Sequence, residues 1–306
     1  MYYILHQHYE SVLRLTKLIS PKKLDNFYGI FNDNKFLKLK PQERLKFLQK
    51  SMPIPDKKYF TLKNFNRIAQ QTVEEMIQYN IDHIDLRISL HFERWNEVKD
   101  IGQAKQIYNK ALANCNNKTI SFIAAIDLTK SEIEIEKNIR VLFNKETLDS
   151  IVGIDITMHE EGVCKFNKYY NTFIRLREDH NKKINMHLGE FTSDEVNCEI
   201  LEKIKPDRIG HGITLLKSSK LCKIIKDNGI CLDMCPISNK ILGVVDWGKY
   251  NPIREAIALG IAVTINMDDP IMFNTNINKE LKIANLNHHQ LKLVVGNSKK
   301  YCGKSN

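Results

Sequence analysis

The stretch INMHLGE, residues 184–190, begins as an apolar strand and ends in groups that carry chemistry. Its first half is a short apolar run, which is typical of a buried strand, and His187 and Glu190 follow at its end. In a (β/α)8 barrel, active-site side chains gather at the C-terminal ends of the strands. The stretch therefore predicts one strand of such a barrel, with a site where that strand ends.

The rest of the chain repeats this unit. Short apolar, β-branched runs occur at residues 2–5, 84–89, 120–126, 150–156, 183–187, 207–211, 229–234 and 261–266. Helical patterns lie between them, and one face of the helix expected at 65–79 carries Phe65, Ala69, Thr72, Met76 and Tyr79. Eight alternating units predict a single α/β domain over residues 1–306, a (β/α)8 TIM-type barrel. The long run from 10 to 83 predicts extra helices inserted after the first strand.

Composition and cysteine usage are those of a soluble protein. Hydrophobic residues make up 42% and charged residues 27% of the 306 residues, and no run approaches the roughly 18 apolar residues of a membrane span. The N-terminus MYYILHQHYE lacks the basic region and cleavage site of a secretory signal, so we expect a cytoplasmic protein. The seven cysteines show no CxxC pair, and Cys231 and Cys235 are expected to be buried thiols rather than metal ligands.

The net charge of +10 permits an anionic partner such as a nucleotide. The basic residues, however, are scattered through Lys/Asn-rich segments, without the pattern of an RNA-recognition motif, a zinc finger or a helix-turn-helix. We therefore expect a small-molecule partner, with neither nucleic acid nor membrane involved. The oligomeric state stays open.

Other strand ends also carry ionisable groups. LHQH ends the first strand, and since strand side chains alternate, His6 and His8 point to the same side. RIGHG ends the sixth strand with His211, and TINMDDP ends the eighth with Asp268 and Asp269.

The two adjacent acids are expected to play different parts. If the eighth strand stays extended to its end, Asp268 continues the inward row of Thr264 and Asn266. Pro270 favours an extended conformation at the residue before it, so the carboxylate of Asp269 is expected to point across the mouth of the barrel.

Each of these motifs also has a simpler interpretation. A histidine pair is often a surface feature, and HLGE can be a turn in which Gly189 takes an unusual φ and Glu190 caps a helix. DDP is commonly a turn, and CPISN, residues 235–239, is typical of a loop. The joint occurrence of three histidine sites and an acid pair at strand ends of one barrel favours a functional site.

The order of these motifs resembles that of a known family. The motifs, in chain order, are LHQH, GIDI, MHLGE, DRIGHG, LDMCPISN, NPIREAIALGIAVTINMDDP and MFNTNINKEL. Together they are similar to the adenosine deaminase family of metal-dependent aminohydrolases, over almost the whole chain and most strongly from Gly153 to Asn297.

The resemblance implies a role for each candidate residue. The implied ligands of one Zn²⁺ per chain are His6, His8, His187 and Asp268. The implied catalytic residues are Glu190 as acid/base, with His211 and Asp269 beside the attacking water. The implied substrate contacts are His8, Glu10 near the ribose, the backbone N–H of Met158, Gly189, and Asp269 at the purine N7.

The reaction implied by the resemblance is zinc-dependent hydrolytic deamination of adenosine, and of 2′-deoxyadenosine, to the 6-oxo purine nucleoside and ammonia. Zinc held by imidazoles and one carboxylate can lower the pKa of a water molecule toward about 7. Glu190 then protonates N1 of the purine, and His211 orients or deprotonates the water. The HxE…PCxxC signature of cytidine-deaminase-type sites is absent from the sequence.

Two positions depart from the family pattern. Ser11 stands where the family usually has glycine, and Met158 stands where it has a small residue, so the Met158 side chain is expected to reshape the purine pocket. The substrate therefore stays open among adenosine, adenine, a modified nucleoside, and an adenine nucleotide such as AMP or N6-methyl-AMP. A catalytically silent barrel used for binding is the third hypothesis.

Overall fold

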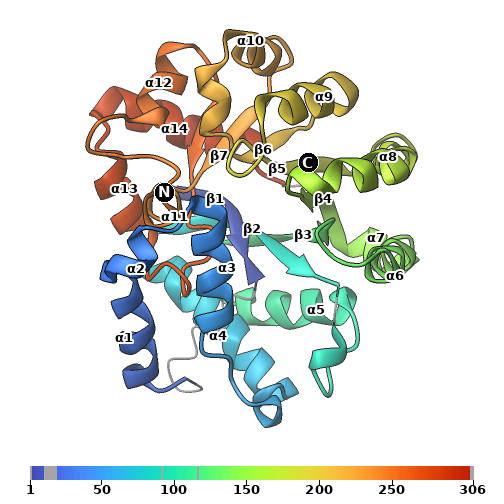
Figure 1. The fold of residues 1–306 in the computed structure, drawn as a ribbon. Coiled ribbons are helices and arrows are strands. Elements are labelled where there is room, and N and C mark those ends of the chain that lie inside the picture. Colours follow the sequence, from blue (N-terminus) through green and yellow to red (C-terminus); the bar gives the residue numbers. More distant parts are fainter. Residues whose placement is uncertain (1, 10–18, 91, 116, 304–306) are drawn as a thin grey trace.

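Eight parallel strands follow one another in chain order around a barrel (Figure 1). The computed structural model describes residues 2–9, 19–90, 92–115 and 117–303, with the backbone alone for Glu93. The strands are β1 (Tyr2–His8), β2 (Ile81–Ser89), β3 (Thr119–Asp127), β4 (Ile151–Thr157), β5 (Lys183–Leu188), β6 (Arg208–His211), β7 (Cys231–Met234) and β8 (Val263–Ile265). The predicted fold class and all eight predicted strands are confirmed, with ends that differ by up to three residues.

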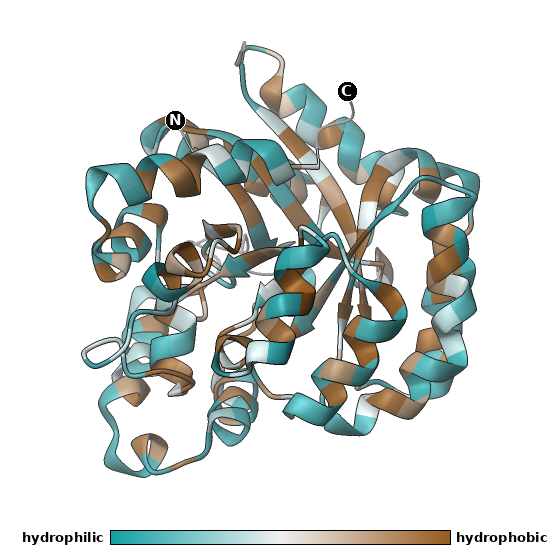
Figure 2. Cartoon of the chain, turned by 90° about the horizontal axis from the view of Figure 1, so that it is seen from above, coloured by the Kyte–Doolittle hydropathy of each residue, from teal (hydrophilic) through white to brown (hydrophobic). Residues whose placement is uncertain are grey.

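The helices surround the strands as the crossover connections of a parallel sheet (Figure 1). They are α4 (Leu62–Gln78), α5 (Ile101–Leu112), α6 (Glu132–Leu142), α7 (Lys145–Ser150), α8 (Val163–Glu178), α9 (Asp194–Ile204), α10 (Ser219–Asp227), α11 (Pro236–Leu242), α12 (Pro252–Ala258), α13 (Ile277–Ala284) and α14 (His288–Tyr301). In α4 the side chain of Thr61 caps the first turn, and Phe65, Ala69 and Met76 are buried, as predicted for this face. Figure 2 shows apolar strands and helices with mixed apolar and polar faces. Among the helices described, none has the length and apolarity of a membrane span.

Three extra helices follow β1, as the long insertion predicts: α1 (Pro21–Gly29), α2 (Asn34–Leu37) and α3 (Pro41–Ser51). Their apolar side chains pack against α11 and the segment after β8 in a cluster of Phe27, Phe36, Leu48, Ile237, Leu242, Met272 and Phe273. Arg44 of α3 donates to the carbonyl of Ile241, and Gln42 lies 2.9 Å from His159 after β4. The insertion therefore reaches loops on two sides of the barrel's C-terminal face.

The barrel closes through a short joint between β1 and the segment after β8. Gln7 and Asp268 form an isolated parallel bridge. The N–H of Asp268 donates to the carbonyl of His6 at 3.0 Å, and the N–H of His8 donates to the carbonyl of Asp268 at 2.9 Å. Because β8 itself ends at Ile265, the closing contacts fall beside the histidines of β1.

Charged side chains fill part of the barrel interior. Two arginines, Arg87 and Arg208, are 1% exposed, and three aspartates, Asp85, Asp155 and Asp233, are fully buried. The arginine nitrogens lie 2.9–3.5 Å from carboxylate oxygens of these aspartates. We call this set the interior ion network. It lies on strands β2, β4, β6 and β7, and each of its charges has an opposite charge of the network within 3.5 Å.

Candidate metal centre and acid/base pair

A bulge in β1 places the first histidine. The pairing with β2 passes from Ile4 opposite Ile84 to Gln7 opposite Leu86, so β1 contains one more residue than β2 in this interval. The carbonyl of Leu5 in the bulge accepts hydrogen bonds from Arg87 and Arg208, and its N–H donates to the Asn266 side chain at 2.7 Å.

His6 and His8 extend from this bulged strand to the same place. Their Nε2 atoms are 3.3 Å apart, as the alternation of strand side chains predicts. His6 is fully buried, and its Nδ1 has no hydrogen-bond partner among the described residues.

His187 lies near the end of β5, and side chains of β4 hold its ring in place. Its Nδ1 is 2.9 Å from Oδ2 of Asp155 and 3.4 Å from the hydroxyl of Thr157, both on β4. This contact orients the ring and engages Nδ1, so Nε2 is left to coordinate a metal. The same Asp155 oxygen is 3.1 Å from Nε of Arg87, which connects His187 to the interior ion network. Arg87 and His187 hold the pKa of Asp155 well below its usual value against the opposing effect of burial.

Asp268 reaches the histidines from a left-handed backbone. Its φ is +56°, and its Oδ1 lies 3.6 Å from Nε2 of His6 and 3.4 Å from Nε2 of His8. The premise of an extended strand end is therefore wrong, because β8 ends three residues earlier. Asp268 nevertheless lies beside the histidines, where the sequence places it by alternation.

These side chains form a cluster with the donors of a metal centre. His6, His8 and His187 offer nitrogen atoms within 4.8 Å of one another, and His6, His211 and Asp268 form a second overlapping group. Three imidazoles and one carboxylate are the donor set of a zinc site. The unpartnered Nδ1 of His6 is an exception to the rule that buried polar atoms are paired, but the set as a whole fits a divalent ion.

Burial and neighbouring charges shift the pKa values of side chains in this cluster. Burial lowers the pKa of His6 well below its usual value, so this ring is neutral, as metal ligation requires. At His8 burial acts to lower the pKa, but Asp268 outweighs it and the pKa is raised. His6 and His8 in turn keep the pKa of Asp268 well below its usual value against the effect of burial.

A second pair of groups lies beside the cluster. Nε2 of His211 is 3.4 Å from Oε2 of Glu190, and both side chains are less than 8% exposed. Burial, followed by the charge of Asp268, raises the pKa of Glu190 well above its usual value. Burial lowers the pKa of His211 to about 3. The pair thus combines a carboxyl that favours its protonated form with a neutral imidazole.

His211 and Gly189 both have left-handed backbones. His211 ends β6 with φ +66°, and Gly189 follows β5 with φ +67°, the unusual φ predicted for this glycine. A Cβ on Gly189 would lie 2.6 Å from Leu215, so only glycine fits there. The Gly189 N–H donates to Thr192, and its carbonyl accepts from Thr214.

Other residues expected to contact the substrate are placed as follows. Asp269 accepts the N–H of Met272 at 2.8 Å, as in a turn. The Met158 side chain is 2% exposed, belongs to the hydrophobic core and lies beside Gly162. Glu10 and Ser11 lie outside the described residues.

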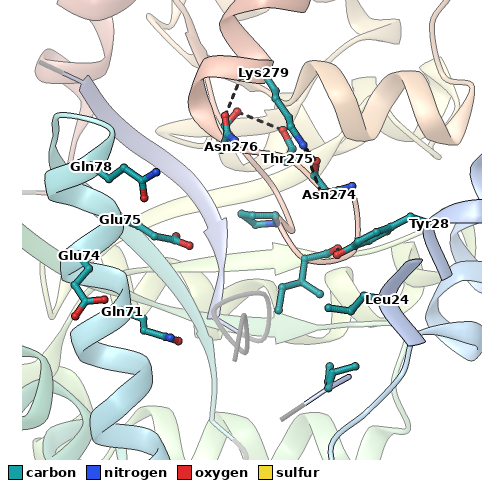
Figure 3. Close-up of a pocket in the computed structure, with 13 residues that line it drawn as sticks. Leu24, Tyr28, Gln71, Glu74, Glu75, Gln78, Asn274, Thr275, Asn276 and Lys279 are labelled. Carbon is teal, nitrogen blue, oxygen red and sulfur yellow. Dashed lines mark hydrogen bonds between the residues drawn. The ribbon is translucent and has the colours of Figure 1, made fainter. Parts of the chain in front are cut away.

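A cavity of about 380 Å³ lies apart from this cluster, between α1, α4 and the segment that leads into α13 (Figure 3). Glu74, Glu75 and Gln78 of α4 face it from one side, and Thr275 and Lys279 lie on the other. Among the described residues that line this cavity, none belongs to the histidine cluster or to the Glu190–His211 pair.

Three residues near the site were not predicted: Asp155, Thr157 and Asn239. Asp155 and Thr157 hold His187, and Asn239 contacts both Glu190 and His211. Asp155 belongs to GIDI and Asn239 to CPISN, so both motifs were noticed without a role for these side chains. Cys231 and Cys235 are fully buried thiols, as predicted.

Comparison with known proteins gives consistent results. The family model described as adenosine deaminase matches residues 34–297. The adenosine deaminase of Clostridium botulinum (strain Okra / Type B1) is 27% identical over 304 residues, which cover 92% of this chain and 85% of the relative.

Solved structures also share the fold. An adenine deaminase from Arthrobacter aurescens superposes with a TM-score of 0.73 at 19% identity, over 100% of this chain and 94% of its own. An Arabidopsis N6-mAMP deaminase gives a TM-score of 0.72 at 16% identity, with coverages of 100% and 94%.

Proposed function

Because the chain belongs to the adenosine deaminase family, we propose that it catalyses the hydrolytic deamination of adenosine and 2′-deoxyadenosine. Water replaces the 6-amino group, so adenosine and water yield inosine and ammonia. The observation that carries the proposal is the buried Glu190–His211 pair, which lies beside a cluster of histidines and Asp268 with the donors of a zinc site.

The proposed metal ligands are His6, His8, His187 and Asp268, for one Zn²⁺ per chain. A zinc ion bound there supplies a nucleophile at neutral pH, because it lowers the pKa of a water molecule toward about 7. The chain's own part is to hold these donors in place. Asp155 orients His187, and the joint between β1 and the segment after β8 keeps Asp268 beside His6 and His8.

The proposed proton transfers use the second pair. Glu190 donates a proton to N1 of the purine as water attacks C6, which removes the aromaticity of the ring. His211 orients or deprotonates the water and stabilises the charge that develops on its oxygen. One proton of the water passes to the 6-amino group, which leaves C6 as ammonia, the other returns to Glu190, and the 6-oxo purine remains. Asp269 is proposed to lie between the water and N7, although Met272 also engages its carboxylate.

A specific observation favours a second candidate substrate, an adenine nucleotide such as AMP or N6-methyl-AMP. Residues 21–63 contain eleven basic and four acidic side chains, most of the chain's excess of positive charge. This segment includes α1 to α3, which pack against loops at the C-terminal face of the barrel. A positive field beside the mouth attracts a phosphate group. The similarity in fold to an N6-mAMP deaminase is compatible with this candidate.

The setting is proposed to be cytoplasmic. All seven cysteines are free thiols in the structure, which supports a reducing compartment.

The test is an ultraviolet assay with zinc-loaded protein. Adenosine, 2′-deoxyadenosine, adenine, AMP and N6-methyl-AMP are compared by kcat/KM, and ammonia release is measured in parallel. We expect adenosine to give the highest value, and Glu190→Gln to lose at least about 10²-fold in kcat because it cannot deliver a proton. The Glu190→Gln variant is expected to retain its zinc.

Each outcome separates the hypotheses. If kcat/KM is higher for AMP or N6-methyl-AMP than for adenosine, the nucleotide replaces adenosine as the proposed substrate. Zinc-loaded protein that turns over none of the five compounds contradicts the proposed reaction and leaves a binding role. Unchanged activity in Glu190→Gln contradicts the acid/base assignment.

A further inference from the structure

Asn239 is a buried amide that contacts both members of the acid/base pair. It lies on α11, directly after β7, and is fully buried. Its Nδ2 is 3.1 Å from Oε1 of Glu190 and 3.1 Å from Nδ1 of His211. No other described side chain is hydrogen-bonded to both Glu190 and His211.

The hydrogen count of the amide determines what each partner must be. A side-chain NH2 group has two hydrogens and no lone pair to offer, so both partners have to be acceptors. Oε1 of Glu190 and Nδ1 of His211 therefore each present a lone pair to Asn239. The reversed amide would place its oxygen 3.1 Å from Oε1 of Glu190, where it repels an ionised carboxylate and accepts from a protonated carboxyl only if the proton is on Oε1.

The consequence for His211 is a single neutral tautomer. If Nδ1 accepts from Asn239, the ring hydrogen is on Nε2, the atom 3.4 Å from Oε2 of Glu190. A nitrogen that already carries a hydrogen cannot take the proton of an attacking water. His211 in this tautomer donates a hydrogen bond to the attacking oxygen and does not act as the base; the proton of the water passes to the Glu190 carboxylate after that group has protonated N1.

The two oxygens of Glu190 have different partners. Oε1 is occupied by the amide, while Oε2 faces His211. Because the contact of Oε2 with His211, at 3.4 Å, is longer than that of Oε1 with the amide, at 3.1 Å, we assign the transferable proton to Oε2.

The position of Asn239 is itself tightly fixed. Pro236 begins α11, and the N–H of Ile237 donates to Oε2 of Glu280 at 2.9 Å. Oε1 of Glu280 accepts from the hydroxyl of Thr275 at 2.6 Å, which connects α11 to the segment after β8. Ile237 also packs against α1 to α3 in the apolar cluster. These contacts fix the backbone that carries Asn239, and the amide itself contacts Glu190 and His211 through Nδ2, while its Oδ1 has no hydrogen-bond partner among the described residues.

We propose that Asn239 is a positioning residue that fixes the Nε2–H tautomer of His211 and reserves Oε2 of Glu190 for the proton that goes to the substrate. This inference rests on the proposed deaminase function, because it assigns how two of the proposed catalytic residues are prepared. It decides between the two roles of His211, in favour of orienting the water and stabilising its oxygen.

The experiment uses zinc-loaded protein labelled with ¹⁵N-histidine. Long-range ¹H–¹⁵N spectra distinguish a ring nitrogen that carries hydrogen from one that does not, and the His211 signals are identified by their loss in His211→Asn. In the wild-type protein we expect hydrogen on Nε2. In Asn239→Asp the new carboxylate accepts from Nδ1, so we expect hydrogen on Nδ1.

Kinetics of the same proteins provide the second readout. Asn239→Asp is expected to lower kcat by about 10²–10³-fold, the usual loss on removal of one donor that stabilises a developing oxyanion, with KM changed less than threefold and zinc content unchanged. Asn138→Asp is the matched control, because Asn138 is also buried but lies on α6 outside the site. It is expected to retain kcat.

Asn239→Ala provides a variant without added charge if Asn239→Asp does not fold. It is expected to show both His211 tautomers and an intermediate loss of kcat. Hydrogen on Nδ1 in the wild-type protein overturns the proposal, and so does an Asn239 variant whose kcat equals that of the control. If the wild-type protein deaminates none of the purines, the proposed function fails, while the tautomer measurement still tests the geometry.

Discussion

Two groups of ionisable side chains lie in the same barrel and differ in how they are paired. In the interior ion network, Arg87 and Arg208 face Asp85, Asp155 and Asp233, so acids and bases are close partners. In the metal-centre cluster the groups are mainly imidazoles around one carboxylate. The first group balances its charges internally, whereas the second has the donor set that a divalent ion would complete.

This difference teaches that buried charge alone does not identify a functional site. Arg208 is as deeply buried as His6, yet its contacts are with the protein's own carboxylates and carbonyls. Asp155 belongs to both groups, because one oxygen contacts Arg87 and His187 together. The network therefore supports the position of a proposed ligand as well as the fold.

The largest effect is expected from breaking the network. Arg87→Met removes one of the two partners of Asp155 and of Asp233 and leaves an excess of buried negative charge, so the free energy of unfolding should fall by about 3–5 kcal/mol. Chemical denaturation measures the change, with and without zinc. Arg175→Met is the matched control, because Arg175 forms an exposed pair with Asp179 and an exposed contact over the Phe143 ring, and it should change stability by about 1 kcal/mol or less. Equal losses in the two variants would contradict the distinction between the two kinds of pair.

A smaller effect is expected from the cluster, and only when metal is present. Asp268→Ala should lose the stabilisation that zinc confers, about 2.7–4.1 kcal/mol at 100 to 1,000 times the dissociation constant, and elemental analysis should find less than one zinc per chain. Without zinc, the two proteins should differ much less. Asp269→Asn is the control and should keep its zinc. Loss of zinc in Asp269→Asn and its retention in Asp268→Ala would reverse the assignment of the ligand.

The smallest effect concerns a buried carboxyl that lacks a guanidinium partner. Burial raises the pKa of Glu280 to about 8, whereas Arg208 lowers the pKa of buried Asp85 against the same effect of burial. A raised pKa means that the folded protein holds the proton more tightly than the unfolded chain. This contribution to stability is therefore complete below the unfolded pKa and is lost as the pH rises through about 8.

Glu280→Gln should remove this pH dependence while keeping an acceptor for the N–H of Ile237. From about pH 6 to about pH 7, the stability of the wild-type protein relative to the variant should fall by up to about 1.4 kcal/mol. Thermal unfolding at a series of pH values measures this difference, and effects common to both proteins cancel. A difference that stays constant, or that grows with pH, would show that Glu280 is ionised in the folded protein.

The strands and their chemistry were largely predictable, because both depend on local pattern. Alternation along β1 places His6 and His8 on one side, and an apolar run followed by His187 indicates a strand end. The conformation of Asp268 was not predictable in this way. Its left-handed backbone depends on the hydrogen bonds to His6 and His8, which are made by residues at the other end of the sequence.

Asn239 shows a second limit of local pattern. The motif CPISN is typical of a loop, and nothing within it points to Glu190 or His211. Its contacts form only in the folded barrel, where the ends of β5 and β6 lie beside α11. Asp155 is a similar case, since its partners Arg87 and His187 lie on two other strands.

The joint between β1 and the segment after β8 also sets the earliest time at which the proposed metal site can be complete. Leu5 and His6 bind the side chain of Asn266, and the partners are separated by 261 and 260 positions. A ribosome that adds about 5–20 residues per second needs roughly 13–52 s to cover this interval. During that time His6 and His8 have been made while Asp268 has not. The full set of proposed ligands is therefore complete only after translation of the last strand.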